Sequence, residues 1–354
     1  MTDTPIDQLL KNPVSFLDDS GPDDDIAISS RIRLARNIKG LPFPQAANEE
    51  TLNQICAMVT SAAQATDVLG GKEMMHFSPA ALSSIDLELL LERRLVSPDF
   101  IRTPLNRCLF VCPGEGCSLM VNEEDQLRIQ TIRPGFQLQD VWKRINKIDD
   151  ELGRHLEYAF DEQLGYLTCC PTNIGTGMRA SVMLHLPGLV LANQIGPTVH
   201  GIGKLHLAVR GIFGEGSNNC GNLFQISNQC TLGESEEKII EGLSLVIRQI
   251  IQQEKYARRK LLDTDRYAIL DHVGRSYGLL RHSYKISFEE AMNSLSGLRI
   301  GVDMGLFTTL DIHRVNELFI AIGSAHLRKK HPGEYSDREL DIIRANCCRE
   351  LLAK

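Results

Sequence analysis

The chain has 354 residues, of which 43% are hydrophobic and 23% charged, as in an ordinary soluble globular protein. Its formal net charge of −7 argues against a general attraction to nucleic acid, and no apolar run reaches the roughly 18 residues of a membrane span. The N-terminal stretch lacks the basic and then apolar segments of a secretion signal, so we expect a cytoplasmic protein.

The ten cysteines do not follow a metal-binding pattern. No CxxC pair occurs, and no histidine lies at zinc-finger spacing from them, so we expect no structural zinc. In a cytoplasmic chain most of them should be reduced and packed as small hydrophobic side chains. Cys170 is singled out because it adjoins a glycine-rich loop.

In chain order, the first strong pattern is Ile26–Leu34, IAISSRIRL, where apolar residues alternate as in a half-buried strand. Its other face carries Arg31 and Arg33, two like charges about 7 Å apart. Such a face meets either water or an anion. The flanking Ser29 and Ser30 and the following Arg36-Asn37 favour a polyanion.

Residues 48–100 are predicted to be mainly helical. Cys117–Ile132 then predicts a hairpin, with two β-rich runs joined by Asn-Glu-Glu-Asp. The three consecutive carboxylates at its tip fit either a solvated loop or a cation site. Arg128, on the outgoing strand, could face the same cavity as Arg31 and Arg33.

A long helix is predicted over Phe136–Phe160, from apolar residues at helical spacing. The stretch after it contains a short strand, the turn signal Pro171-Thr172-Asn173, and two glycines before Arg179. This loop could gather backbone N–H groups into an anion nest, with Arg179 gripping phosphate. It lacks the ending of a Walker P-loop, and it could equally be an ordinary glycine turn followed by a solvated arginine.

The strand predicted over Leu205–Arg210 delivers a further arginine to a polar face, and a glycine-rich loop after it carries Glu215 as a candidate lid. Only helices are predicted beyond it. Their predicted ranges are Ser235–Leu262, Asp263–Leu280, Phe288–Ser296, Asp311–Lys330 and Asp337–Leu352, two of them with capping boxes, Ser287/Glu290 and Ser336/Glu339.

Four segments carry a resemblance to a known family: SSRIRL, NEEDQLRI, CPTNIGTGMRAS and RGIFGEGS. In this order they are similar to the signature segments of the phosphagen (ATP:guanidino) kinases. Within that group the chain most resembles the McsB family of bacterial protein arginine kinases, over roughly Ile26–Glu254.

The resemblance implies an α+β fold. Residues 1–254 would form a phosphagen-kinase-like catalytic domain, with a glutamine-synthetase-like antiparallel sheet covered by helices. Residues 255–354 would form a helical domain that binds phosphoarginine in regulation or serves dimerisation. Small-molecule phosphagen kinases carry a whole helical domain before the SxRxR strand. Here only some 25 residues precede it, which suits a protein substrate.

The resemblance also implies roles for individual residues. Glu124 and Glu215 would clamp the acceptor guanidinium and take its proton, with Cys170 aligning it. ATP would be held with Mg²⁺ in an arginine cradle and no metal ligand is assigned to the protein. The implied ATP-binding residues are Ser29, Ser30, Arg31, Ile32, Arg33, Arg94, Arg128, Arg179, Ala180, Ser181, Val182, Met183, Arg210, Gly211, Ile212, Phe213 and Gly214.

The chain departs from the family pattern at several positions. Gln126 and Arg94 stand where histidine is usual, and Phe213 where tyrosine is common. Near the C-terminus, Asp341 and Arg344 match two members of a phosphoarginine-binding helix motif, but Leu340 replaces its first arginine. This helix could therefore retain a weakened phosphoarginine site or merely pack an interface.

The implied function is ATP-dependent phosphorylation of arginine side chains in proteins, in protein quality control and the stress response. The implied partners are protein substrates, an McsA-like activator, the Clp protease and chaperone system, and a second copy in a homodimer, with no nucleic acid and no membrane. Two alternatives remain open: a kinase for free arginine or another small guanidino compound, and a non-catalytic adaptor that binds phosphoarginine or nucleotide.

Overall fold

The computed structural model describes residues 5–17, 21–211, 220–307 and 310–353. Its centre is an eight-stranded sheet in the order β2-β3-β4-β5-β1-β8-β10-β9, in which every neighbouring pair is antiparallel. The strands are β1 (Ala27–Arg36), β2 (Met75–Phe77), β3 (Cys108–Val111), β4 (Cys117–Val121), β5 (Leu127–Pro134), β8 (Met178–His185), β9 (Leu207–Gly211) and β10 (Leu223–Asn228). A small separate hairpin joins β6 (Phe160–Asp161) to β7 (Gly165–Tyr166).

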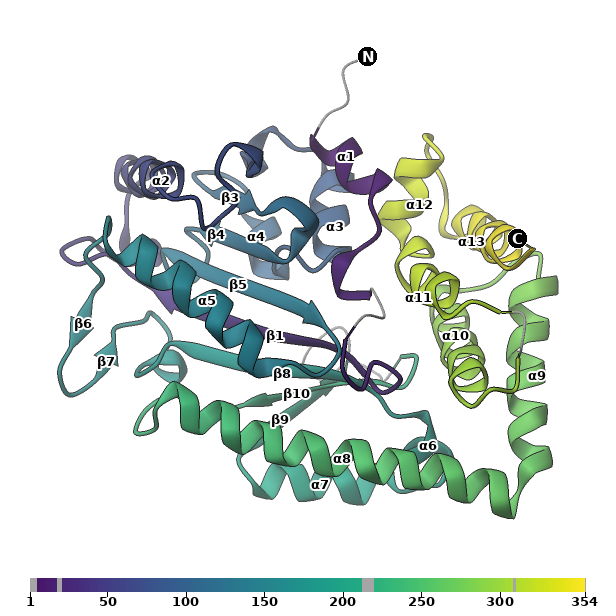
Figure 1. Cartoon of the computed structure of the whole chain (residues 1–354). Coiled ribbons are helices and arrows are strands. Elements are labelled where there is room, and N and C mark those ends of the chain that lie inside the picture. Colours follow the sequence, from purple (N-terminus) through teal and green to yellow (C-terminus); the bar gives the residue numbers. More distant parts are fainter. Residues whose placement is uncertain (1–4, 18–20, 212–219, 308–309, 354) are drawn as a thin grey trace.

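One face of the sheet is covered by two helices, α5 (Leu138–Gly153) and α8 (Glu236–Thr264) (Figure 1). Side chains of β1 alternate between the two faces of the sheet. Ile32 and Leu34 point to the face that the helices cover, where they are fully buried. They join one large core with apolar side chains of α5, α8 and α2 (Glu49–Gln64). This layering leaves the opposite face of β1 to its arginines.

The β2–β4 end of the opposite face is covered by short helices. There α1 (Pro5–Lys11), α3 (Ser84–Glu92) and α4 (Pro98–Arg102) form a smaller core with Leu109, Val111 and Met120. Two further helices, α6 (Pro187–Leu191) and α7 (Ile195–Lys204), lie between β8 and β9 in the chain.

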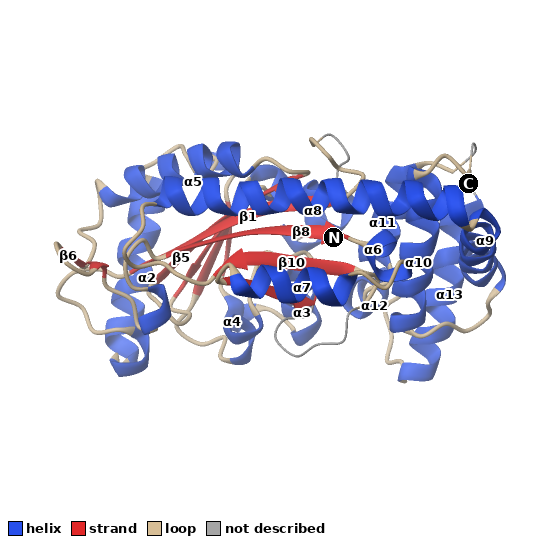
Figure 2. Ribbon diagram, turned by 90° about the horizontal axis from the view of Figure 1, so that it is seen from below, coloured by secondary structure: helices blue, strands red, loops and turns tan. Residues whose placement is uncertain are grey.

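The C-terminal part of the chain is helical in all of its described elements and lies at one end of the sheet, where α8 leads to it (Figure 2). Its helices are α9 (Arg266–His282), α10 (Phe288–Asp303), α11 (Ile312–Ala321), α12 (Ser324–Lys330) and α13 (Asp337–Ala353). They build a second core, to which Met183 and Leu223 of the sheet also contribute. In the part of the chain that is described, no helix combines the length and apolar character that crossing a membrane requires.

Buried polar side chains fasten these helices to the sheet at His185, the last residue of β8. Arg299 of α10 donates from Nη1 to His185 Nδ1 (3.0 Å), so His185 donates from Nε2 to Ser296 Oγ (2.8 Å). His185 is completely buried. Burial, together with the cationic Arg299 and Arg258, holds the pKa of His185 well below its usual range.

The predicted α+β fold with a helical C-terminal part is confirmed, and so is the β4–β5 hairpin. Both predicted capping serines accept from the third residue of their helices, Ser287 Oγ from Glu290 N and Ser336 Oγ from Glu339 N. The predicted boundary at residue 254 lies within the continuous helix α8 and stays a prediction.

Three predicted elements differ from the structure. The long helix ends at Gly153 rather than Phe160, because the chain after it bonds to the end of β1 through Ala159 N and Asn37 O (2.7 Å). The predicted helix over Asp311–Lys330 is two helices that part at Gly323, where the Glu92 carboxylate accepts from the first backbone N–H groups of α12. The mainly helical region 48–100 also contains β2.

Candidate active site

The five predicted arginines lie on one face of the sheet. Arg33 of β1 is the direct cross-strand partner of Arg179 in β8, and Arg31 lies two residues before it. On the other side of β1, Arg128 is opposite Ala35, which shares the face of Arg33. Arg210 in β9 is opposite Gln225 of β10, whose Oε1 accepts from Arg31 Nη2 (3.0 Å). The predicted clustering of Arg31, Arg33 and Arg128 is therefore present in the structure.

Neutral polar side chains on the same face orient these arginines. Arg31 Nη1 also lies 3.5 Å from Gln130 Oε1, and Arg179 Nη2 donates to Ser227 Oγ (3.1 Å). Sequence analysis missed Gln130, Gln225 and Ser227. The alternation Arg128/Gln130 in β5 was the available signal, since it places both side chains on one face.

The electrostatics of this face favour an anion. Burial, followed by the nearby Arg94, Arg179 and Arg128, lowers the pKa of Arg31 to about 9. The pKa of Arg33 is held well below its usual range by burial and then by Arg31, Arg128 and Arg179. Arginine stays protonated in proteins, so these shifts express an electrostatic cost of gathering the cations. A polyanion would relieve that cost.

Arg94 joins this cluster as a sixth cation. Among the charged neighbours of Arg31 it lowers the pKa of that residue most, and burial lowers its own pKa to about 10. Its backbone lies in the left-handed region (φ 59°), and its carbonyl accepts from Gln130 Nε2 (2.7 Å). Arg94 therefore lies near Arg31, and its role in binding ATP stays a prediction.

The three carboxylates at the tip between β4 and β5 lie in different environments. Glu123 is buried, pairs with Arg128 and accepts from Ser97 Oγ. Asp125 is also buried, and its Oδ1 accepts from Asn37 Nδ2 and from Cys169 N, both at 2.7 Å. The solvated-loop interpretation is therefore wrong for these two residues. Across the described ranges, no group of three His, Cys, Asp or Glu side chains could hold a metal ion.

Glu124 is the accessible member of the three, with 38% of its side chain exposed and its Oε2 4.0 Å from Arg128 Nη1. Burial raises the pKa of Glu124, as do the neighbouring carboxylates Asp125 and Glu123, while Arg128 opposes the shift. The Cys170 thiol is near enough to this carboxylate to lower its pKa, and its Sγ lies 3.0 Å from Thr172 Oγ1. Glu124, predicted to clamp the acceptor, and Cys170, predicted to align it, are therefore neighbours.

Gln126, the departure from histidine, is a fully buried structural residue. Its side chain accepts from Ile38 N (2.7 Å) and donates to Pro42 O (2.8 Å), while its own N–H donates to Asn37 Oδ1 (2.9 Å). These bonds fix the tip against the end of β1.

The glycine loop before Arg179 is a close backbone contact. A Cβ on Gly175 (φ 108°) would lie 2.1 Å from Thr231 O, and one on Gly177 (φ 61°) would lie 2.6 Å from Ala35 O. Thr176 N donates to Thr231 O (2.9 Å) rather than pointing at a shared anion position. The structure therefore favours a glycine turn over the anion nest, with Arg179 itself on the arginine face.

The prediction that Arg36 helps Arg31 and Arg33 to bind a polyanion is wrong. Its position in β1 places it opposite to Arg31 and Arg33. It is 1% exposed and donates from Nε and Nη2 to Asp149 Oδ2 (3.0 and 2.7 Å). Arg36 is a structural cation that ties β1 to α5.

The other predicted ATP-binding residues lie on both faces of the sheet, because side chains alternate along a strand. Ile32, Ala180 and Val182 are fully buried in the core on the far face, and Ser30 Oγ donates to Gly135 O (2.9 Å). Their side chains cannot reach the arginine face. Ser29, Ser181 and Met183 are buried, and Gly211 ends β9. Ile212, Phe213, Gly214 and Glu215 lie outside the described residues.

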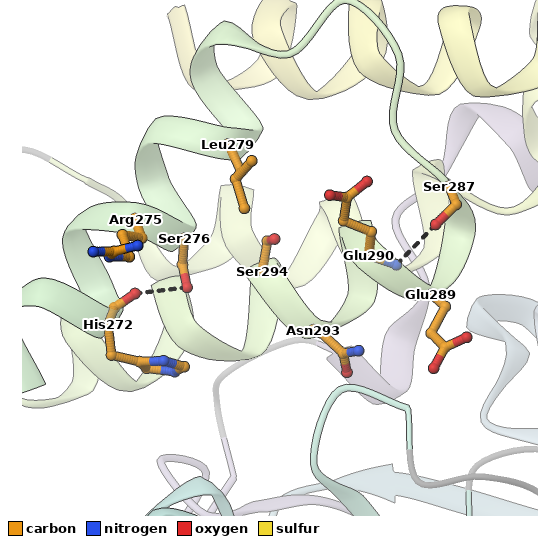
Figure 3. Close-up of a pocket in the computed structure, with 9 residues that line it drawn as sticks. All are labelled: His272, Arg275, Ser276, Leu279, Ser287, Glu289, Glu290, Asn293 and Ser294. Carbon is orange, nitrogen blue, oxygen red and sulfur yellow. Dashed lines mark hydrogen bonds between the residues drawn. The ribbon is translucent and has the colours of Figure 1, made fainter.

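Asp341 and Arg344 are adjacent on α13, with Arg344 Nη1 donating to Asp341 Oδ1 (2.6 Å). Arg344 is 3% exposed and also donates to Ile322 O (3.0 Å) and Ile286 O (3.2 Å), while Leu340 is buried among apolar side chains. This arrangement serves packing, and the phosphoarginine role stays a prediction. An open cavity of about 500 Å³ lies between α9 and α10 and is lined by His272, Arg275 and Glu290 among others, and none of its lining residues is a predicted site residue (Figure 3).

These features together suit the transfer of a phosphate group. A cluster of arginines can hold a polyphosphate, and a half-exposed carboxylate with raised pKa stands at the edge of that cluster. Phosphoryl transfer depends mainly on such positioning and charge neutralisation.

Comparison with known families agrees with this geometry. A family model for the ATP:guanido phosphotransferase C-terminal catalytic domain matches residues 54–257. The chain belongs to the ATP:guanido phosphotransferase family. A model for the protein-arginine kinase McsB C-terminal domain matches residues 266–354.

Relatives of known name define the group more narrowly. A protein-arginine kinase of Pelotomaculum thermopropionicum is 45% identical over 341 residues, 96% of this chain and 95% of that protein. One of Bacillus subtilis is 41% identical over 338 residues, 96% of this chain and 93% of that protein. Within its family the chain therefore belongs to the protein-arginine kinases, which confirms the predicted family and enzyme class.

Solved structures show the same fold. The duplicated taurocyamine kinase of Schistosoma mansoni with bound transition state analog components has a TM-score of 0.59 and 25% identity, covering 70% of this chain and 35% of that chain. The chain thus spans about a third of that duplicated protein. A lombricine kinase has a TM-score of 0.59 and 23% identity, covering 68% of this chain and 70% of that one, a likeness of fold alone.

Proposed function

We propose that the protein transfers the γ-phosphate of ATP to the guanidinium of arginine side chains in proteins, with the arginine face holding the polyphosphate and Glu124 receiving the acceptor. The single observation that carries this proposal is the sharing of one sheet face by Arg31, Arg33 and Arg179, with Glu124 at the edge beside Arg128. Mg²⁺ would enter with ATP as the Mg-ATP substrate, since Mg²⁺ commonly coordinates substrate phosphates and water.

The chemistry assigned to Glu124 follows from the acceptor. A guanidinium is protonated and a poor nucleophile until it is oriented and loses a proton. A carboxylate can grip it through paired hydrogen bonds and take that proton, while the guanidinium nitrogen bonds to the γ-phosphorus and ADP leaves. The Cys170 thiol beside Glu124 would align the acceptor. Glu215 would be the second carboxylate, a role assigned by resemblance alone.

The wider setting is proposed on the same resemblance. It comprises a cytoplasmic location, a role in protein quality control and stress response, an McsA-like activator, delivery to the Clp system and a homodimer. The helical part beyond residue 254 would be a regulatory or dimerisation domain. Asp341 and Arg344 would contribute to a phosphoarginine site there.

The test is incubation with Mg-ATP and an unfolded protein, followed by mass spectrometry for acid-labile phosphoarginine. We expect modified arginines with the natural protein and almost none with Glu124→Gln. Phosphorylation of free arginine but of no protein would favour a small-molecule guanidino kinase. Binding of nucleotide without any transfer would favour an adaptor. Either outcome would contradict the proposal.

A further inference from the structure

A cleft of about 440 Å³ opens beside the acidic tip of the β4–β5 hairpin. Its walls come from the first turn of α2 with Leu52, the loop after α4 with Leu105 and Arg107, and the tip with Glu124. Cavities of about 300–1,000 Å³ accommodate ligands of many atoms. The cleft is therefore larger than one guanidinium requires.

This cleft is continuous with the place assigned to the acceptor. Glu124, whose carboxylate lies beside Arg128 and Cys170, is part of its wall. Gln45, also in the wall, donates from Nε2 to Glu124 O (3.0 Å) and accepts at Oε1 from Cys169 Sγ (2.8 Å). The Gln45 side chain thus connects the cleft to the two segments that carry Glu124 and Cys170.

Among the mostly polar and charged residues that line the cleft are two leucines that the chemistry of transfer does not need. Leu105 is 62% exposed, and Leu52 lines the same cleft. An arginine bound alone at Glu124 would leave both in water. A polypeptide that continues on either side of the arginine could cover them with its own apolar side chains, which is favourable in proportion to the apolar area removed from water.

The walls are held in place without any ligand. Arg107 Nη1 donates to Asp99 O (2.7 Å) and Phe100 O (2.6 Å), which fixes the loop of Leu105 to α4. The buried Asn122, at the tip, donates from Nδ2 to Leu52 O (2.9 Å) and Asn106 O (2.8 Å). A preformed cleft spares the ordering cost that binding would otherwise incur.

We propose that this cleft binds the polypeptide segment that flanks the acceptor arginine, with Leu52 and Leu105 contacting apolar side chains of that segment. The inference rests on the proposed function and names the substrate class of the same site: extended, unfolded segments in which apolar residues flank the arginine. A folded protein keeps such residues in its core and cannot offer them to a cleft.

The test compares Leu105→Ala with Leu245→Ala, a matched change on α8, where Leu245 is 60% exposed on the far side of the sheet. With a permanently unfolded, alkylated protein as substrate, we expect Leu105→Ala to raise KM for the protein about three- to tenfold. Its KM for ATP and its kcat should stay unchanged. Leu245→Ala should match the natural protein in all three.

A second arm uses short peptides with one arginine flanked by leucine or by serine. The natural protein should prefer the leucine peptide in kcat/KM, and Leu105→Ala should lose most of that preference. Equal use of both peptides by the natural protein, or the same preference in both proteins, would overturn the proposal. A changed sedimentation of Leu105→Ala with unaltered KM would assign the cleft to another copy of the chain and overturn it too.

The two proposals fail in different ways. If the natural protein phosphorylates no protein, the proposed function fails and this inference with it. If it phosphorylates protein and Leu105→Ala has the natural KM, only the cleft proposal fails.

Discussion

Arg33 and Arg179 are direct cross-strand partners on β1 and β8, with both side chains on the same face of the sheet. Like charges in this relationship destabilise a sheet, commonly by about 0.2–1 kcal/mol. Arg33 Nε is also buried without a hydrogen-bond partner among the described residues. Without nucleotide, the repulsion between these two arginines therefore lowers the stability of the folded chain. A bound polyphosphate would attract both of them and offset this repulsion.

The first prediction follows from this cost. Arg33→Gln should leave the free energy of unfolding without ATP unchanged or higher by up to about 1 kcal/mol, because it removes a repelled cation. It should also lose the stabilisation by ATP, which for the natural protein is about 2.7 kcal/mol at 100 times Kd. Denaturant unfolding with and without Mg-ATP measures both. Arg133→Gln, at an exposed position of β5, is the control and should keep the ATP effect. A full ATP effect in Arg33→Gln would contradict the cradle.

The second prediction concerns geometry rather than charge. Arg179→Lys and Arg210→Lys should each lower kcat/KM for ATP at least about tenfold, because lysine cannot reproduce the bidentate fork of arginine on phosphate. Steady-state kinetics with varied ATP measures this. Arg154→Lys, an exposed arginine after α5, should be neutral. Normal kinetics in both test variants would mean that these arginines are not phosphate ligands.

The third prediction assigns the proton acceptor. Glu124→Gln should lower kcat about 10²–10⁴-fold and leave nucleotide binding nearly intact, which is the usual size of a general-base contribution. Glu157→Gln, at an exposed carboxylate, should have natural turnover. Nucleotide binding measured by calorimetry distinguishes lost chemistry from lost binding, and near-natural turnover would remove Glu124 from the mechanism.

The same carboxylate should shape the acid side of the pH profile. A base works only when ionised, and the pKa of Glu124 is raised by burial and by the neighbouring Asp125 and Glu123. Activity should therefore fall, as pH decreases, at a higher pH than an ordinary glutamate would give. The profile of kcat/KM for the acceptor between about pH 4.5 and 8 reports this value for the free enzyme.

Much of the arginine face could be predicted from sequence, because strand alternation alone places Arg31 with Arg33 and Arg128 with Gln130. The same alternation places Arg36 on the opposite face. The prediction that Arg36 helps to bind a polyanion is wrong because it considered the charge of the residue and not its position in the strand. The different environments of Glu123 and Glu124 could not be predicted. They depend on how the tip packs against Ser97 and Arg128. The sequence shows only two adjacent glutamates and does not indicate which of them is buried.

The fourth prediction concerns stability and the junction at His185. Because the folded-state pKa of His185 is lowered, the unfolded chain binds the proton more tightly below about pH 6.5. Its contribution to stability is therefore complete above that pH and is lost as pH falls, at up to about 1.4 kcal/mol per pH unit. The nearby Asp303 has a raised pKa from burial and acts in the opposite direction, so denaturant unfolding should be measured between about pH 5.5 and 7.5.

His185→Gln should flatten this pH dependence, since glutamine keeps a donor and an acceptor for Ser296 and Arg299 but does not titrate. His155→Gln, at an exposed position after α5, should keep the natural slope. An unchanged slope in His185→Gln would show that the acid sensitivity arises elsewhere.

The last prediction separates two roles of the α13 helix. Arg344 donates to the backbone carbonyls of Ile322 and Ile286, so Arg344→Ala should destabilise the fold by roughly 2 kcal/mol or more, whatever its regulatory role. It cannot by itself test a phosphoarginine site. Asp341→Asn is the sharper variant, because its side chain is 20% exposed and asparagine still offers an oxygen to Arg344.

We expect free phosphoarginine to bind the natural protein weakly, since Leu340 supplies no charge, and to change the kinase rate only modestly. Asp341→Asn should keep the natural melting temperature while losing both responses, because the guanidinium of the ligand would lose its ionised partner. Asp337→Asn, an exposed carboxylate in the first turn of the same helix, is the control and should respond as the natural protein does. Binding and rate should be titrated in parallel for all three proteins. If phosphoarginine has no effect on any of them, α13 is a packing element alone, as its buried Leu340 and Arg344 already favour.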